Sequence, residues 1–271
     1  MSRRKLLAMD LDGTAVKDDY SMCQSSILAI QKAQKHGHVV CFVTGRRDVD
    51  MLSLGEEQYC VDYHILNNGG KIVHCKDKKV IVNKTIDNNA SRQLIEYALN
   101  NNLQIHIVDG MTWQVSKMTK GTLDYASTLG VIPEEFSSIS NINYKNLEGM
   151  MATSDLKPIA EYIDSKQLNM TYIHSEPGTI DIMAKNVNKW SGILELARIE
   201  NIGIKDVIAV GNYYNDIDMI EKAGTGIAVA NSVEEVKKIA DYVTKQDNNH
   251  DAVEEIIDLI IKGEFDWWKN I

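Results

Sequence analysis

The chain has 271 residues, of which 44% are hydrophobic and 25% are charged, and its net charge is −9 at pH 7. This length allows one large domain or two modest ones, with enough apolar residues for a core in either case. The acidic balance argues against nucleic acid or an anionic membrane as the main partner, because both are polyanions. An acidic protein that handles anions needs a local positive site or a metal ion.

Targeting and redox features place the chain among ordinary cytoplasmic proteins. The basic residues 1–5 are followed by only four apolar residues, too few for the core of a signal peptide. No stretch approaches the length of a transmembrane span. The four cysteines lie far apart and form no C-x-x-C pair, which suggests neither a zinc site nor a disulfide framework. We therefore expect a reduced, cytoplasmic protein with no membrane partner, and the sequence leaves its oligomeric state open.

The first part of the chain, residues 1–82, alternates between apolar runs and helical patterns. This order predicts parallel β-α-β units. The expected strands are 6–9, 39–43 and 63–66, and the expected helices are about 21–37 and 48–58. Polar residues or glycines follow each strand, at the carboxyl ends where open α/β sheets place their ligand sites.

The middle part, residues 83–184, has a different pattern, which we interpret as an inserted α+β domain. Two strands are expected to form a hairpin about the turn residues Asp109 and Gly110. The expected helices are 88–100 and 156–166, and the expected strands are 104–108, 112–115, 170–173 and 179–182.

The parallel pattern returns in the third part, residues 185–271. The expected helices are 190–201, 233–240 and 251–261, and the expected strands are 207–210, 226–229 and 242–244. The first and third parts are therefore predicted to form one discontinuous core domain. Trp267 and Trp268 are expected to pack the last helix against it, with a dimer contact as the alternative.

Asp10 and Asp12 follow the first apolar run, and strand alternation places both side chains on the same side. Two like charges so close together are unfavourable unless a cation neutralises them. A hard divalent metal such as Mg²⁺ does so with oxygen ligands. Asp10 is a candidate nucleophile, because carboxylates form covalent phosphoenzyme intermediates. Asp12 is close enough to protonate the leaving oxygen and then to activate water.

Three further strand ends or helix starts carry polar groups that suit a phosphate or a metal ion. Thr44 offers a hydroxyl and Gly45 a backbone N–H. Lys189 supplies a positive charge for the nucleophile and the transferring group. Oxygen ligands from a third loop are Asn212, Asn215 and Asp216.

Each of these features has an ordinary structural explanation when it stands alone. A single D-x-D can be a polar turn, T-G-R is usually only a turn, a lysine at a helix start is usually solvated, and N-x-x-N-D can be only a helix cap. Their conjunction in the order D-x-D-G-T, T-G-R, K and G-N-x-x-N-D is much more specific.

With these motifs the whole chain resembles the haloacid dehalogenase superfamily of phosphatases, in particular its Cof-type (IIB) subgroup. The resemblance implies a three-layer Rossmann-like α/β core with a parallel sheet, and an inserted α/β domain that is a C2-type cap closing over the site. It implies that Asp10 is the aspartyl nucleophile and Asp12 the acid/base. Asp10 by its side chain and Asp12 by its backbone carbonyl would bind Mg²⁺.

The resemblance also implies the contacts of a phosphate group and the function. Those phosphate contacts are Thr44, Gly45, Lys189 and Asn215, and Arg46 is placed to reach the substrate or the cap. The expected activity is Mg²⁺-dependent hydrolysis of small phosphorylated metabolites, with sugar phosphates as the default. Phosphoryl transfer, as in the related phosphomannomutases, and a phosphometabolite-binding protein with reduced activity remain alternatives.

One position departs from the pattern of that family. Its fourth motif usually reads G-D-x-x-N-D, and the first Asp, a metal ligand, is Asn212 here. An amide oxygen still coordinates Mg²⁺, but one negative charge is lost, and Asp216 is the candidate to compensate, directly or through water. We therefore expect weaker Mg²⁺ binding than in relatives that carry Asp, with activity retained.

Overall fold

A computed structural model describes residues 3–154, 156–176 and 178–266 of the chain. It divides the chain into two compact units. The core unit comprises Met1–Thr44, Leu54–Ile81 and Asn188–Ile271, and the inserted unit comprises Gly45–Ser53 and Val82–Val187. Trp267 and Trp268, for which packing against the last helix was predicted, lie outside the described residues.

The core unit contains a sheet with strand order β14-β13-β12-β1-β2-β3-β4-β5. Pairing is parallel from β14 through β3, and β4 pairs with β3 in the antiparallel sense. Every residue of β1 and β2 is buried, as continuous apolar runs covered on both faces require. The strands are β1 (Leu6–Met9), β2 (Val39–Val43), β3 (Tyr63–Leu66), β4 (Lys71–His74), β5 (Lys79–Asn83), β12 (Val207–Gly211), β13 (Thr225–Ala228) and β14 (Tyr242–Val243).

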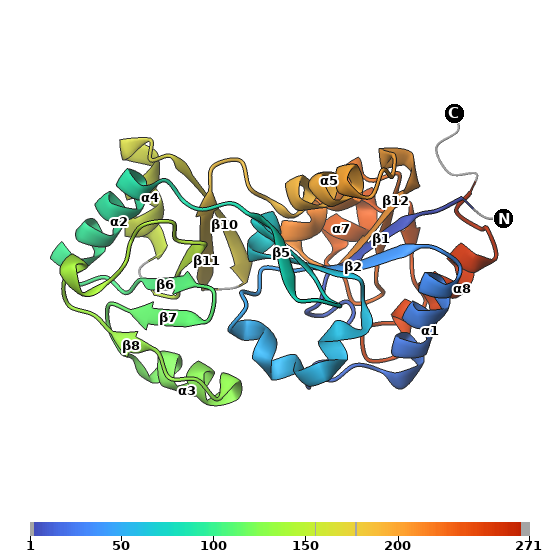
Figure 1. The fold of residues 1–271 in the computed structure, drawn as a ribbon, viewed down its shortest axis with the longest axis horizontal. Coiled ribbons are helices and arrows are strands. Elements are labelled where there is room, and N and C mark those ends of the chain that lie inside the picture. Colours follow the sequence, from blue (N-terminus) through green and yellow to red (C-terminus); the bar gives the residue numbers. More distant parts are fainter. Residues whose placement is uncertain (1–2, 155, 177, 267–271) are drawn as a thin grey trace. The chain divides into compact units, whose positions relative to one another are not determined.

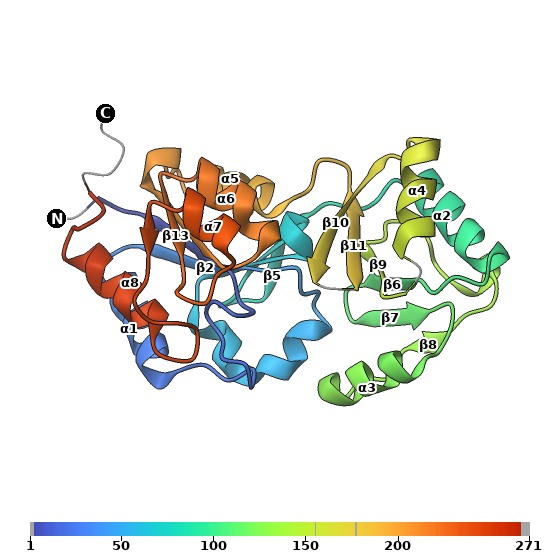
Figure 2. The same cartoon turned by 180° about the vertical axis from the view of Figure 1, so that it is seen from behind.

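Helices cover both faces of this sheet, so the core unit has three layers. Helices α1 and α8 pack against each other on one face, and α5, α6 and α7 lie on the other (Figures 1 and 2). The predicted three-layer α/β core is confirmed, whereas β4 and the edge strand β5 were not predicted. The helices are α1 (Gln24–Lys35), α5 (Lys189–Ile199), α6 (Ile217–Lys222), α7 (Glu234–Ile239) and α8 (Ala252–Ile261).

The inserted unit is built on a second sheet, with order β10-β11-β9-β6-β7-β8. Its pairings are antiparallel except that of β7 with β8. The predicted hairpin is present, with Asp109 of β6 opposite Thr112 of β7. The strands are β6 (His106–Asp109), β7 (Thr112–Val115), β8 (Glu134–Glu135), β9 (Gly149–Ala152), β10 (Met170–Glu176) and β11 (Thr179–Ala184).

Each face of this second sheet has its own apolar cluster. Helices α2 (Asn88–Asn100) and α4 (Leu156–Lys166) bury their apolar sides against β6, β9 and β11. Alternate residues of β6 and β7, Val108 and Trp113, point to the opposite face and pack against α3 (Lys120–Leu129). Val49 joins this second cluster, and this contact explains why Gly45–Ser53 belongs to the inserted unit.

The segment around Val49 is also held by a buried ion pair. Arg47 donates from Nε to Asp50 Oδ2 at 2.6 Å and from Nη2 to Asp50 Oδ1 at 3.1 Å, and the Tyr125 hydroxyl donates to Asp50 Oδ1 at 2.8 Å. The helix predicted over about 48–58 is present as a 3₁₀ helix, Asp50–Cys60, that is broken where Gly55 has φ +60°. Other short 3₁₀ turns are Asn67–Gly69, Ile139–Asn141, Ile204–Asp206 and Tyr214–Asp216.

Within the described ranges, none of the helices combines the length and the apolar character needed to cross a membrane. All four cysteines are free thiols.

Candidate active site

The predicted site residues of the core unit follow neighbouring parallel strands at the carboxyl edge of the sheet. Asp10 follows β1 and extends its ladder, because its N–H donates to Val210 O of β12 at 2.9 Å. Thr44 follows β2, and Asn212 follows β12. Since β1 pairs with both β2 and β12 in the parallel sense, these three chain segments leave the sheet at the same edge.

Lys189 enters the site from the first turn of α5. Asn188 caps this helix, since its Oδ1 accepts the Ser191 N–H at 2.8 Å while Ser191 Oγ accepts the Asn188 N–H at 3.1 Å. This capping box fixes where the helix begins and therefore where the lysine points. The Lys189 side chain is 1% exposed and donates to Asp10 Oδ1 at 2.7 Å and to Asp216 Oδ1 at 2.6 Å.

Asp216 ties the lysine to the loop after β12. Its Oδ2 accepts the backbone N–H groups of Asn212 at 2.8 Å and Tyr213 at 3.0 Å, so both carboxylate oxygens are engaged. The approach requires Gly211, because a Cβ at that position would lie 2.5 Å from Asp216 Cγ. The glycine of the G-N-x-x-N-D motif therefore makes room for the last carboxylate of the same motif.

Burial and the neighbouring charges shift the pKa values of both Asp10 and Lys189. Burial, with the neighbouring charges of Asp216 and Asp12, raises the pKa of Asp10 to about 7, although Lys189 opposes the shift. Burial would lower the pKa of Lys189, but Asp10 and Asp216 outweigh it and raise that pKa well above its usual value. The lysine is therefore a permanent cation, while Asp10 binds its proton unusually tightly.

The turn after Asp10 is closed by one carbonyl. Leu11 O accepts the N–H groups of Thr14, Ala15 and Val16 at 3.1, 2.9 and 3.0 Å. Gly13 has φ +70°, and a Cβ there would lie 2.3 Å from Asn212 Nδ2. Any other residue at position 13 would thus collide with the side chain that departs from the family pattern. Asp12 is half-buried within this turn.

The donor set of this site fits a divalent cation. Asp12 and Asp216 both disfavour the ionised form of Asp10, and the single positive charge of Lys189 is shared between Asp10 and Asp216. Among the described residues no three His, Cys, Asp or Glu side chains converge on one possible metal position. A metal here would therefore use fewer carboxylates together with amide, carbonyl and water oxygens, all of which Mg²⁺ accepts.

The other predicted site residues lie in different parts of the structure: Thr44 and Asn215 in the core unit, Gly45 and Arg46 in the inserted unit. Thr44 is buried, its N–H donates to Ile65 O and its carbonyl accepts the Asn68 N–H, both at 2.9 Å. Asn215 is half-buried in the 3₁₀ turn Tyr214–Asp216. Gly45 and Arg46 belong to the inserted unit. There the Arg46 guanidinium donates from Nη1 to Asp50 O at 3.0 Å and to Ser53 Oγ at 2.6 Å.

Sequence reasoning did not single out three polar residues near these segments. The Thr14 hydroxyl and both polar atoms of the Asn67 side chain are buried without hydrogen-bond partners. Asn231, which follows β13, donates from Nδ2 to Gly13 O at 2.8 Å. The signal that could have found Asn67 and Asn231 is the one that found Asn212: each follows a parallel strand at its carboxyl end.

Comparison with known proteins identifies relatives over almost the whole chain. The model of the haloacid dehalogenase-like hydrolases matches residues 7–257. Phosphatase YwpJ of Bacillus subtilis (strain 168) is 22% identical over 275 residues, which cover 91% of this chain and 96% of that protein. The 5-amino-6-(5-phospho-D-ribitylamino)uracil phosphatase YitU of the same organism is 27% identical over 267 residues, covering 92% and 94%.

Solved structures share the fold. A haloacid dehalogenase-like hydrolase from Bacteroides thetaiotaomicron aligns with a TM-score of 0.84 at 25% identity, covering 95% of this chain and 100% of that one. The sugar phosphatase BT4131, described as a member of subclass IIB, aligns with a TM-score of 0.81 at 23% identity, covering 94% and 98%.

Proposed function

Because this chain belongs to the haloacid dehalogenase-like hydrolase family and is a phosphatase, we propose that it hydrolyses small phosphorylated metabolites through a covalent intermediate on Asp10. The family predicted from the D-x-D-G-T, T-G-R, K and G-N-x-x-N-D motifs is confirmed. The observation that carries the proposal is the buried Lys189 ammonium held between Asp10 and Asp216 at the sheet edge. This arrangement keeps a carboxylate and a fixed positive charge side by side, as phosphoryl transfer requires.

In the proposed reaction, Asp10 attacks phosphorus and the ester oxygen leaves. Asp12 gives its proton to that oxygen, so that a neutral alcohol departs. Asp12 then takes a proton from water, which attacks the aspartyl phosphate and releases inorganic phosphate and free Asp10. Lys189 stays protonated and offsets the negative charge of the phosphoryl group throughout. Thr44, Gly45 and Asn215 are proposed to contact the phosphate oxygens, and Arg46 to contact the substrate.

We propose Mg²⁺ as the cofactor, held by the Asp10 side chain, the Asp12 backbone carbonyl and the Asn212 amide oxygen. When bound it would supply positive charge to the phosphoryl oxygens. The sequence alone left open whether Asn212 or Asp216 is the third ligand, and the engagement of both Asp216 oxygens favours Asn212. We propose that Asp216 acts instead by holding Lys189 and the loop after β12.

The substrate class rests on the relatives. YitU is named for a phosphorylated ribitylamino compound and BT4131 for sugar phosphates. A screen of phosphorylated sugars, sugar alcohols and that pyrimidine compound, with p-nitrophenyl phosphate as the general substrate, tests the proposal. We expect phosphate release that requires Mg²⁺ and is lost with EDTA. Absence of hydrolysis across the panel in the presence of Mg²⁺ would refute the proposal.

The free cysteines are in keeping with a cytoplasmic enzyme.

Mg²⁺ should bind more tightly as the pH rises from about 6 to about 8, because Asp10 must lose its proton to coordinate the ion. The pKa of Asp10 is about 7 in the folded protein, against 3.8 for an ordinary Asp. The folded state holds this proton more tightly than the unfolded chain. The metal-free protein therefore loses stability as the pH rises from 3.8 to beyond about 7. Melting temperatures with and without MgCl₂ measure the effect, which needs no turnover. A larger Mg²⁺-induced shift at pH 6 than at pH 8 would contradict the prediction.

Replacing Asn212 by Asp should lower the Mg²⁺ concentration for half-maximal activity by roughly tenfold, because a carboxylate adds a charge where an amide now stands. The two side chains have the same shape, so the approach to Gly13 is preserved. A magnesium titration of the variant measures the change. Asn143→Asp, which adds a charge at an exposed position of the inserted unit, is the control. An unchanged half-saturation for Asn212→Asp would show that this position is not a ligand.

A further inference from the structure

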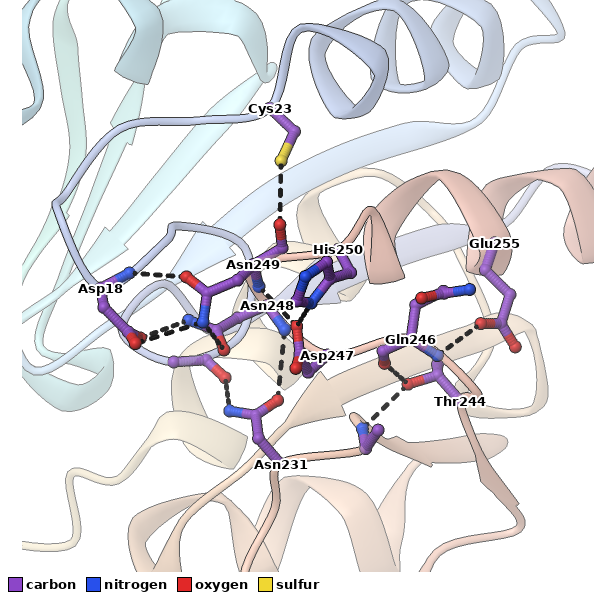
Figure 3. A network of polar contacts seen from close by, with 12 residues as sticks. Asp18, Cys23, Asn231, Thr244, Gln246, Asp247, Asn248, Asn249, His250 and Glu255 are labelled. Carbon is purple, nitrogen blue, oxygen red and sulfur yellow. Dashed lines mark hydrogen bonds and ion pairs between the residues drawn. The ribbon is translucent and has the colours of Figure 1, made fainter.

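Two asparagines of the C-terminal part of the core unit, Asn231 and Asn248, lie side by side (Figure 3) and bind the turn that carries Asp12. Asn231 Nδ2 donates to Gly13 O at 2.8 Å, and Asn248 Nδ2 donates to Val16 O at 3.1 Å. The two asparagines are linked, because the Asn248 N–H donates to Asn231 Oδ1 at 3.2 Å. That bond orients the Asn231 amide so that its NH₂ group faces Gly13.

A second pair of contacts holds the continuation of the turn. Asn248 Nδ2 also donates to Asp18 Oδ1 at 2.9 Å, and Asn249 Nδ2 donates to Asp18 Oδ2 at 3.2 Å. In return the Asp18 N–H donates to Asn249 Oδ1 at 3.2 Å. These bonds lower the pKa of Asp18, which keeps this carboxylate an ionised acceptor. The Asn248 side chain is buried, so its bond to Val16 O is shielded from competing water.

We propose that Asn231 and Asn248 are positioning residues that orient Asp12 for proton transfer to the leaving group. Both carbonyls that they hold belong to residues adjoining Asp12: Gly13 is its direct neighbour in the chain, and Val16 pairs with it in a β-bridge. The Leu11 carbonyl accepts N–H groups of the turn itself, whereas the two asparagines donate to carbonyls of the turn from a distant part of the chain. Gly13, with its left-handed backbone, is the point at which the turn can most easily reorient. This inference rests on the proposed role of Asp12.

The leaving group distinguishes this role from a merely structural one. A nitrophenolate ion departs readily without a proton, whereas a phenolate ion needs one much more, so p-nitrophenyl phosphate and phenyl phosphate differ in their demand on Asp12. The ratio kcat/KM reports the steps up to leaving-group departure. Loss of stability or of general site geometry lowers it for both substrates by the same factor.

The test variant is Asn231→Asp, which keeps the acceptor for the Asn248 N–H but replaces the donor to Gly13 O with a carboxylate oxygen. We expect kcat/KM to fall about tenfold more for phenyl phosphate than for p-nitrophenyl phosphate. Asn248→Ala, which removes the contact to Val16 O by another route, should show the same selective loss. It also keeps the inference testable if Asn231→Asp does not fold.

Two reference variants make the outcomes separable. Tyr242→Phe removes a hydrogen bond of the same C-terminal segment, from the Tyr242 hydroxyl to Glu255 Oε1 at 2.7 Å, without touching residues 13–18 or either asparagine. It should lower the melting temperature and leave the ratio of the two substrates unchanged. Asp12→Asn should show the selective loss in full. If Asp12→Asn lowers both substrates equally, the proposed role of Asp12 is wrong. If Asp12→Asn is selective and both asparagine variants are not, the positioning inference is overturned.

Discussion

Asp10→Asn should reduce phosphatase turnover by at least roughly 10⁴-fold while leaving the protein folded. The amide nitrogen has no nucleophilic lone pair, and its oxygen is a much weaker nucleophile than a carboxylate. Hydrolysis of p-nitrophenyl phosphate at saturating Mg²⁺ measures the loss. Acid quenching after brief exposure to a substrate labelled in its phosphoryl group should trap the aspartyl phosphate as label on the unmodified protein. The variant should carry no label.

The stability of Asp10→Asn is the second half of this prediction. The pKa of Asp10 is raised to about 7, so its ionised form is disfavoured where it lies. An Asn amide keeps an oxygen for the Lys189 ammonium and brings no charge to the repulsion with Asp12 and Asp216. The metal-free variant should therefore melt at the same temperature as the unmodified protein or higher. Asp77→Asn, at a carboxylate whose side chain is 58% exposed, should change neither property. Turnover near the original rate would refute the nucleophile assignment.

The strand ends could be read from the sequence because the core sheet is built from continuous apolar runs. Residues 6–9 and 39–43 are apolar throughout, which is typical of strands covered on both faces. Once they are parallel neighbours, geometry alone brings Asp10 and Thr44 to one edge. The candidate site was predicted from this rule and from the motif order.

Other parts of the fold depend on contacts that no local pattern encodes. Strand β9 is only four residues long, and its role as the centre of the second sheet depends on pairing with β6 and β11. Gly45–Ser53 directly follows a core strand in the sequence, yet Val49 and the Arg47–Asp50 pair bind it into the inserted unit. Both features are set by tertiary packing, which overrides local propensity.

The roles within the G-N-x-x-N-D loop were also beyond the sequence. Its oxygens all suggested metal ligands, but Asp216 is turned back towards its own loop by two backbone N–H groups. The close approach over Gly211, seen in three dimensions, separates Asp216, which supports the lysine, from Asn212, the proposed metal ligand.

Asp216→Asn should have the opposite effect from Asp10→Asn, because Asp216 accepts hydrogen bonds on both oxygens. One oxygen accepts the Lys189 ammonium, and the other accepts two backbone N–H groups. An Asn amide has one oxygen, which accepts, and one NH₂ group, which donates. In either orientation the NH₂ group therefore faces a donor, which is either the Lys189 ammonium or the two backbone N–H groups. A buried donor without a partner costs about 1–3 kcal/mol, and a charged one costs more. We expect the free energy of unfolding to fall by roughly 3 kcal/mol.

Thermal and urea unfolding measure this loss, and a matched ion pair on the surface provides the control. Glu161 pairs with Lys157 at 3.7 Å on α4, and the two side chains are 66% and 85% exposed. Glu161→Gln should therefore change the stability by less than about 0.5 kcal/mol. If Asp216→Asn were as stable as the unmodified protein, Asp216 would not hold the loop through both oxygens. Its carboxylate would then be available to a metal ion, and the argument for Asn212 as the third ligand would no longer hold. The stability of this variant therefore tests whether both oxygens of Asp216 are engaged in the loop, and the magnesium titration of Asn212→Asp tests the ligand itself.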